Sequence, residues 1–295
     1  MKPVIGGQAV IEGVMMQNGD RIAVAVRRES DGEILVRPIP ARVRFKKLGN
    51  IPFLRGLFRL FDMLSLGLRA LNLSTQLAFP EEEQLSKGGT FVTFAIAIVI
   101  AVGAFIVLPL VLTNTIPGLG NSVLYNLVEG LIRLLFFFAY LLVISRMSDI
   151  HRVFQYHGAE HKTVYTYEAD EELTVENARK HSTLHPRCGT AFLMTVFVIA
   201  ILIFSLAGKP VMWLRILSRL LLLPVVAGVS YEVLRFSGRN YDRWWVRLLA
   251  QPGLWLQRLT TAEPDDDMLE VAIASMNRVL EDPASPSDAA AEPTA

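Results

Sequence analysis

The sequence contains little charge and almost no cysteine. Charged residues make up 19% of the 295 positions, against about 25% in an average soluble protein. The single cysteine, Cys188, excludes an intramolecular disulfide, so nothing indicates an oxidising compartment. The formal net charge of +1 argues against nucleic-acid binding, which needs a basic face. The N-terminus lacks a charged segment followed by a long apolar run, so it does not resemble a cleavable signal peptide.

Long uncharged runs, in contrast, are abundant. Residues 91–113 form a run of 23 positions without a charge, and a membrane-spanning helix needs about 20 apolar residues. Further apolar runs predict spans near 123–145, 190–208 and 213–234. We therefore predict an α-helical polytopic membrane protein with four transmembrane helices in contact with the lipid bilayer. A soluble enzyme and a disordered protein are both excluded by this pattern.

Lys and Arg are distributed unevenly between the loops. Residues 1–90 contain 13 of them and residues 146–189 contain six, whereas the loop at 114–122 contains none. Lys and Arg are enriched in cytoplasmic loops. Both termini and the segment 146–189 are therefore expected on the cytoplasmic side of the inner (cytoplasmic) membrane.

The N-terminal 50 residues are predicted to form a small cytoplasmic β-rich subdomain. Two β-rich runs, 22–28 and 34–39, flank Asp31 and Gly32, and an Asp-Gly pair between such runs is a strong hairpin signal. The segment upstream should hold another strand or two that end at the turn of Asn18 and Gly19.

The remaining segments are predicted to be helical or disordered. Residues 52–78 have an amphipathic pattern that suits either the membrane interface or packing against the helix bundle. Interfacial and amphipathic helices should follow the fourth span, and the Pro/Ala/Ser-rich tail should be disordered. The chain thus divides into segments 1–50, 51–90, 91–145, 146–189, 190–234, 235–282 and 283–295.

All five histidines lie in the polar segment 146–189, within 35 positions of one another. His157 and His161 should lie one turn apart on a helix that continues the second span, with Glu160 at the flank of that face. This H-x-x-E-H spacing is that of inverted zinc proteases. Two imidazoles can chelate a divalent transition metal, with zinc expected, and a carboxylate beside them can either ligate the metal or act as general base on a bound water. We predict His157 and His161 as ligands and Glu160 as the catalytic base.

Zinc usually takes three or four protein ligands, and the same segment offers candidates for the rest. These are His181, His185, Cys188, Glu168 and Glu176. Pro186 disfavours helical geometry at His185, so this histidine and Cys188 would approach the metal from a loop. A different interpretation stays open, in which the histidines bind lipid headgroups or cap helices and Cys188 is a small buried residue.

Ionisable residues inside the predicted spans also need an explanation, because they are unfavourable in hydrocarbon. Glu129 and Arg133 lie four residues apart in the second span and can pair along one helix face. We expect a structural ion pair that faces the bundle interior, with an ion path as the alternative. Glu232 ends the fourth span at the depth of the histidine segment and is a candidate additional ligand.

Several runs of the sequence resemble a known family. They are GGQAVIEGVMM (6–16), YHGAEHK (156–162), HPRCGT (185–190), QRLTT (257–261) and EPDD (263–266). The chain resembles the YqhQ-like bacterial membrane proteins from residue 3 to about residue 280. That family is of unknown function and is labelled a predicted metal-dependent enzyme, so the resemblance implies a metal site. Glu12, in the first run, is either a charge on the open face of a strand or a further ligand.

Three functions remain open at this point. The first is a membrane-embedded metal-dependent hydrolase with its site at the cytoplasmic face. The second is a non-enzymatic metal-binding scaffold or regulator that binds a membrane-protein or cytoplasmic partner. The third is a small transporter, in which homo-oligomerisation would enlarge the pore. A nucleic-acid partner is not expected.

Overall fold

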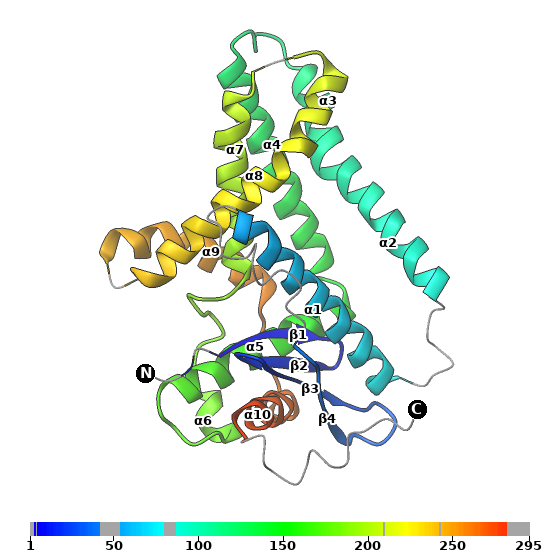
Figure 1. The fold of residues 1–295 in the computed structure, drawn as a ribbon, viewed down its shortest axis with the longest axis vertical. Helices are drawn as coiled ribbons and strands as arrows, with labels where there is room; N and C mark the ends of the chain where they lie inside the picture. The colour runs from blue at the N-terminus through cyan, green and yellow to red at the C-terminus, as the bar shows by residue number, and fades with distance from the viewer. Residues whose placement is uncertain are drawn as a thin grey trace.

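The computed structural model describes residues 3, 5–41, 54–79, 87–208, 210–241 and 243–281. In this part of the chain a mostly helical structure is joined to one antiparallel sheet (Figure 1). The strands are β1 (Gly6–Val10), β2 (Gly13–Asn18), β3 (Arg21–Arg27) and β4 (Ile34–Pro38). The helical elements are α1 (Leu54–Ala78), α2 (Lys87–Val102), the π-helical turn η3 (Gly103–Val107), α3 (Leu108–Asn114), α4 (Ser122–Ile144), α5 (Ser148–Glu168), α6 (Val175–Arg179), α7 (Thr190–Leu206), α8 (Met212–Arg239), α9 (Trp244–Thr260) and α10 (Asp266–Leu280).

Residues 6–38 form the small N-terminal antiparallel sheet that the sequence predicts. Its strands pair in the order β1-β2-β3-β4, and each neighbouring pair is antiparallel. The turns contain Gly19 and Gly32, whose φ angles of 61° and 74° cost glycine less than other residues. Residues 42–50, the end of the predicted subdomain, lie outside the described residues.

The central strands of this sheet are buried on both faces, which explains the uninterrupted apolar runs 14–16 in β2 and 22–26 in β3. Because side chains alternate between faces, Met16 and Ala25 lie on one face, where they contact residues of α5 and α10. Met15 and Val24 lie on the other face, in a cluster with residues of α1. The sheet is therefore a middle layer between α1 on one side and α5 with α10 on the other (Figure 1).

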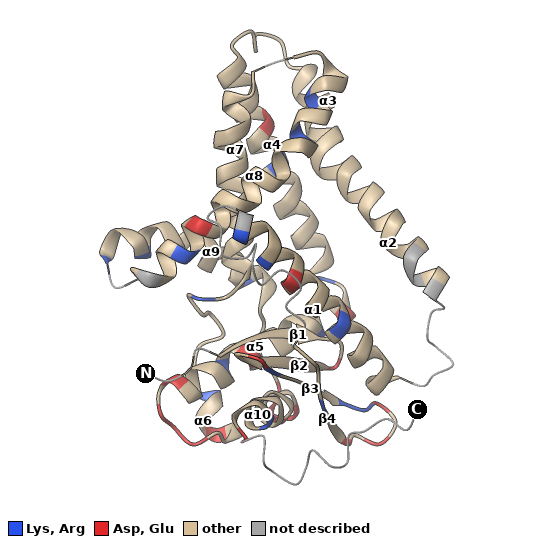
Figure 2. Cartoon of the chain, viewed as in Figure 1, with Lys and Arg blue, Asp and Glu red and all other residues tan. Residues whose placement is uncertain are grey.

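Three helical segments of the described chain are long and apolar enough to cross a membrane. They are Val92–Asn114, Ser122–Ile144 and Met212–Gly238, and α7 is an apolar helix of 17 residues. Figure 2 shows few charged residues along these helices compared with the sheet and its surroundings. Large apolar side chains such as Val99 and Leu135 are exposed along them, 70% and 69%. Such surfaces are compatible with contact with a lipid bilayer.

The helix that carries the histidine motif is separate from the second apolar helix. The α4 helix ends at Ile144, and Met147 adopts an extended conformation before α5 begins at Ser148. The predicted continuation of one helix into the other is therefore not observed. The break lets α5 turn beneath the sheet, where it contacts β1 and α10 (Figure 1).

The other predicted helices lie close to their expected positions. The α1 helix packs against the sheet and α8, and a Cβ added at Gly56 would lie 2.7 Å from Tyr231. The α9 helix exposes Trp244 and Trp255 while it contacts α7. The α10 helix begins with two aspartates at its N-terminus, where negative charge favours a helix. The predicted disordered tail, 283–295, lies outside the described residues.

Candidate metal centre

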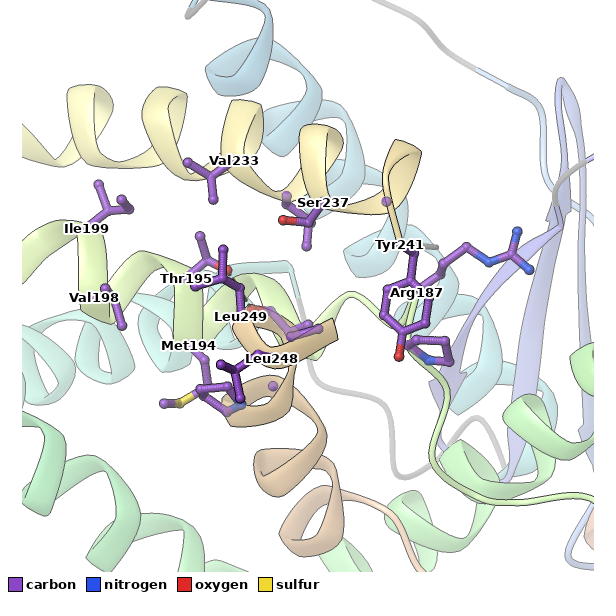
Figure 3. Close-up of a pocket in the computed structure, with 17 residues that line it drawn as sticks. Arg187, Met194, Thr195, Val198, Ile199, Val233, Ser237, Tyr241, Leu248 and Leu249 are labelled. Carbon is purple, nitrogen blue, oxygen red and sulfur yellow. Dashed lines mark hydrogen bonds between the residues drawn. The ribbon is translucent and has the colours of Figure 1, made fainter. Parts of the chain in front are cut away.

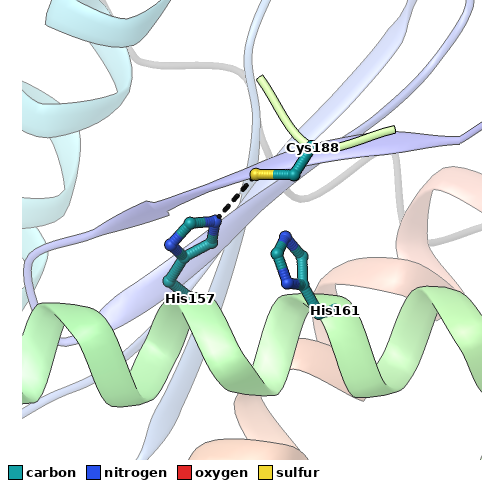
Figure 4. A group of neighbouring side chains, drawn as sticks. All are labelled: His157, His161 and Cys188. Carbon is teal, nitrogen blue, oxygen red and sulfur yellow. Dashed lines mark hydrogen bonds between the residues drawn. The ribbon is translucent and has the colours of Figure 1, made fainter. Parts of the chain in front are cut away.

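Three side chains of the histidine segment place atoms that can bind a metal within 4.8 Å of one another: His157, His161 and Cys188 (Figure 4). The two histidines lie one turn apart on α5, and their ring centroids are 4.4 Å apart. Cys188 comes from the loop that precedes α7, and its thiol lies 3.2 Å from Nε2 of His157. Two neighbouring imidazoles from one helix thus face a sulfur from a different segment.

Backbone carbonyls orient both imidazole rings. Nδ1–H of His157 donates to the carbonyl of Thr260 at 2.8 Å, and Nδ1–H of His161 donates to the carbonyl of Thr183. Because a carbonyl can only accept, Nδ1 of each ring carries a proton, and the neutral form of each ring then has its lone pair on Nε2. Metal-binding histidines are commonly held by this kind of second hydrogen bond.

His161 is the more deeply buried of the two histidines. It is 2% exposed, and its Nε2 has no hydrogen-bond partner among the described residues. Burial lowers the pKa of His161, because a charged imidazolium is disfavoured away from water. A neutral imidazole with a buried, unpartnered nitrogen beside a thiol is suited to bind a metal.

A buried lysine supports the segment that supplies the Thr183 carbonyl. Lys162 lies next to His161 on α5 and donates from Nζ to the carbonyls of Arg179 and His181, at 3.1 and 2.8 Å. Its ammonium group also pairs with Glu263 at 3.0 Å. Lys162 therefore fixes the loop that returns from α6 against the helix that carries both histidines.

The structure places Glu160 beside the cluster, against the sheet. Its carboxylate accepts a hydrogen bond from the amide of Gly7 in β1, and a Cβ at Gly7 would lie 2.8 Å from its Cγ. Burial raises the pKa of Glu160, whereas His157 and His185 favour its charged form. The predicted base is thus a buried carboxyl group near the cluster, but it is not one of the three residues that form it.

The two other predicted histidine ligands contact carboxylates instead. Nε2 of His181 lies 3.0 Å from Glu171, and Nε2 of His185 lies 3.3 Å from Glu168. The ring of His185 nevertheless lies 5.7 Å from that of His161, centroid to centroid. The structure therefore brings together three of the five predicted ligands, and the assignment of the other two stays a prediction.

The more remote carboxylates that the sequence singled out have partners elsewhere. Glu12 contacts α5, but it pairs with Arg152 at 2.7 Å rather than with the cluster. Glu176 lies 3.8 Å from Lys180. Glu232 accepts a hydrogen bond from Nε of Arg55 at 2.6 Å, so it joins α8 to α1.

Glu129 and Arg133 form an ion pair within the apolar helices, and a second arginine joins them. Arg219 of α8 is fully buried and lies 2.9 Å from the carboxylate of Glu129. Nε of Arg133 also donates to the carbonyl of Phe105 in the π-helical turn, at 2.8 Å. One carboxylate therefore faces two guanidinium groups inside the helical bundle.

Sequence reasoning missed the groups that orient the histidines. The carbonyls of Thr183 and Thr260 leave no side-chain pattern, because any residue type could supply them. Lys162 was visible as a charge beside His161, but nothing in the sequence showed that it would be 3% exposed. The run QRLTT, which contains Thr260, was the one available signal for that contact.

The fold and the cluster together define a mostly helical protein with three candidate membrane spans and an antiparallel sheet. The sheet packs on the helix that carries two histidines, and a cysteine from the loop before α7 lies beside them. The family described as "Protein of unknown function (DUF1385)" matches residues 51–282. The uncharacterized protein YqhQ of Bacillus subtilis (strain 168) is 35% identical, over 94% of this chain and 92% of its own length. The chain belongs to this family. No solved structure matches it.

Proposed function

We propose that the protein is a membrane-embedded, metal-dependent hydrolase whose metal ligands are His157, His161 and Cys188. One observation carries this proposal. Each histidine donates its Nδ1–H to a backbone carbonyl, which leaves both Nε2 lone pairs available beside the thiol of Cys188. A divalent transition metal, with zinc expected, fits this set of two nitrogens and one sulfur.

The residues of the cluster support hydrolysis in different ways. Catalytic zinc sites have three protein ligands and an open position, where the metal supplies an activated water when bound. The two neutral imidazoles bind through nitrogen, and the cysteine binds as the thiolate. Glu160 is buried beside the cluster, and burial raises its pKa, which makes its carboxylate a stronger proton acceptor.

The proposal places this site at the cytoplasmic surface of the inner membrane. The α7 helix, at 17 residues, is at the lower limit of about 17 for a spanning helix, and it would be the fourth span. An even number of spans puts both termini on one side. The excess of Lys and Arg in segments 1–90 and 146–189 supports the cytoplasmic side. The exposed tryptophans of α9 suit an interfacial helix.

Metal analysis of the detergent-purified protein tests the ligand set. We expect close to one zinc, iron or manganese ion per chain by elemental mass spectrometry in the wild type. His157→Ala, His161→Ala and Cys188→Ala should each lose it. His151→Ala is the matched control, because His151 lies on the same helix outside the cluster, and it should retain the metal. A well-folded protein that holds no metal after reconstitution would contradict the proposal.

One observation favours a non-enzymatic scaffold as the second candidate. The two histidines are oriented by Thr183 and Thr260, which lie in separate segments, so a metal bound there would fasten these segments together. Cobalt substitution distinguishes the two functions. An open catalytic site should change its visible spectrum when azide is added, because azide can occupy the free position, whereas a closed structural site should not respond.

A further inference from the structure

A cavity of about 310 Å³ lies between α7, α8 and α9 (Figure 3). Its walls are mainly apolar, and they include Met194, Val198, Ile199, Val233, Leu248 and Leu249. The volume falls at the lower end of the range for ligand-binding pockets, which begins at about 300 Å³. The cavity is therefore large enough for part of one lipid acyl chain, whose remainder would extend out of it.

The cavity is polar at one end. Arg187 and Tyr241 lie together at this end in Figure 3, whereas Val198, Ile199 and Val233 lie at the opposite end. In Figure 3 the guanidinium of Arg187 extends beyond this end and away from the other lining side chains. It forms an ion pair with Glu168, and the side chain is 44% exposed. It has five N–H donors, so it can bind an additional anion. This arrangement fits a ligand with an apolar chain and an anionic head.

The apolar end continues into the surface that we assign to the bilayer. Val198 is 49% exposed on α7, and Leu248 and Leu249 are each 64% exposed on α9. A chain inside the cavity would therefore contact side chains that also face the lipid. The bilayer itself supplies molecules of this shape, and they would enter without crossing water.

The polar end adjoins the metal centre through the backbone. Pro186 and Arg187 line the cavity, and the next residue is Cys188 of the metal cluster. Pro252 and Gly253 of α9 also line it, and a Cβ at Gly253 would lie 2.7 Å from the Cβ of Ala191. This close packing of α9 on α7 holds the wall of the cavity directly beside the loop of Cys188.

We propose that this cavity binds one acyl chain of an anionic membrane phospholipid, with the lipid headgroup held at Arg187. The lipid site is inferred from the cavity alone. That such a lipid belongs to the substrate class of the hydrolase rests on the proposed function. The substrate would then be an amphiphile taken from the membrane rather than a soluble compound.

Native mass spectrometry of the delipidated, detergent-solubilised protein tests the proposal. The probes are dioleoyl phosphatidylglycerol, which is anionic, and dioleoyl phosphatidylcholine, which has the same chains and a zwitterionic head. We expect one tightly retained phosphatidylglycerol in the wild type. Val233→Trp, which fills the cavity, should abolish its retention. Leu221→Trp is the matched control on α8, since Leu221 is 68% exposed and outside the cavity, and it should retain the lipid.

Arg187→Gln tests the headgroup contact separately. A hydrogen bond to a charged group contributes about 1.5–3 kcal/mol. The ratio of retained phosphatidylglycerol to retained phosphatidylcholine should therefore fall by about tenfold or more in this variant. Arg258→Gln, which removes an exposed charge elsewhere on α9, should keep this preference. Equal retention of both lipids by the wild type, or full retention by Val233→Trp, would overturn the proposal.

Metal content measured on the same samples separates this inference from the proposed function. Loss of lipid from Val233→Trp with the metal retained supports the cavity as an independent lipid site. A wild type that binds lipid but no metal contradicts the hydrolase and leaves the lipid site standing. A wild type that binds metal but retains no lipid overturns the lipid site alone.

Discussion

The side-chain amide of Gln257 forms two hydrogen bonds with the backbone of His185. Oε1 of Gln257 accepts from the His185 N–H at 2.8 Å, and Nε2 donates to the His185 carbonyl at 2.9 Å. Gln257 is 0% exposed, so no water replaces these bonds. In this way α9 fixes the loop that carries Cys188 three residues further on.

Gln257→Leu should weaken both the fold and the metal centre. The substitution leaves the buried N–H of His185 without a partner, and such a group costs about 1–3 kcal/mol. The His185 carbonyl loses one of its two bonds and keeps the one from the Cys188 amide. We expect a lower melting temperature and a weaker metal affinity, measured by competition with a chromophoric chelator. Gln251→Leu, on the first half of α9 and partly exposed, is the control. An unchanged metal affinity in Gln257→Leu would show that the loop is held by other contacts.

Gly158→Ala should disturb the metal centre although the residue has no side chain. A Cβ there would lie 2.1 Å from the carbonyl oxygen of Ala262, so the segment that supplies the Thr260 carbonyl must move. We expect reduced thermal stability and reduced metal content. Gly238→Ala should do neither, because its Cβ meets nothing within 4 Å, and alanine in a helix gains about 0.5–1 kcal/mol over glycine. Equal melting temperatures for the two variants would contradict this account.

Glu129→Gln should destabilise the helical bundle strongly. The change leaves Arg133 and Arg219 buried without their common carboxylate, and breaking a buried ion pair costs about 3–5 kcal/mol. Thermal unfolding in detergent measures the effect. Glu232→Gln is the control, because its pair with Arg55 is partly exposed. A double variant, Glu129→Gln with Arg219→Met, should recover part of the loss, and its failure to do so would mean that Arg219 is stabilised by other contacts.

Glu160→Gln should keep the metal. In the structure the carboxyl group of Glu160 bonds to the Gly7 amide and is not part of the His157, His161 and Cys188 group. Elemental analysis should therefore find the wild-type metal content. A substrate assay, once a substrate is found, should show loss of turnover if Glu160 is the base. Loss of metal from this variant would instead make Glu160 a ligand and remove its proposed role as base.

The parts of the structure that follow from neighbouring residues could be predicted from the sequence. The hairpin at Gly32 depends on a local turn, and the one-turn spacing of His157 and His161 depends on a single helix. The break before Ser148 could not be predicted, because no proline or glycine precedes it and burial of α5 beneath the sheet determines it. The sequence also could not show which candidate ligand lies beside the two histidines. Cys188 is 31 positions from His157, and only the tertiary packing of its loop brings it close to α5.

The contact of α10 with the sheet has a consequence for the order of folding. Asn18 donates to the carbonyl of Val279 at 3.1 Å, a separation of 261 positions, and Ser275 donates to the carbonyl of Ala23. During synthesis, the first strands therefore leave the ribosome long before the helix that completes their core. Contacts this distant in sequence form slowly. Until the last helix emerges, the face of the sheet that α10 covers therefore lacks this part of its core.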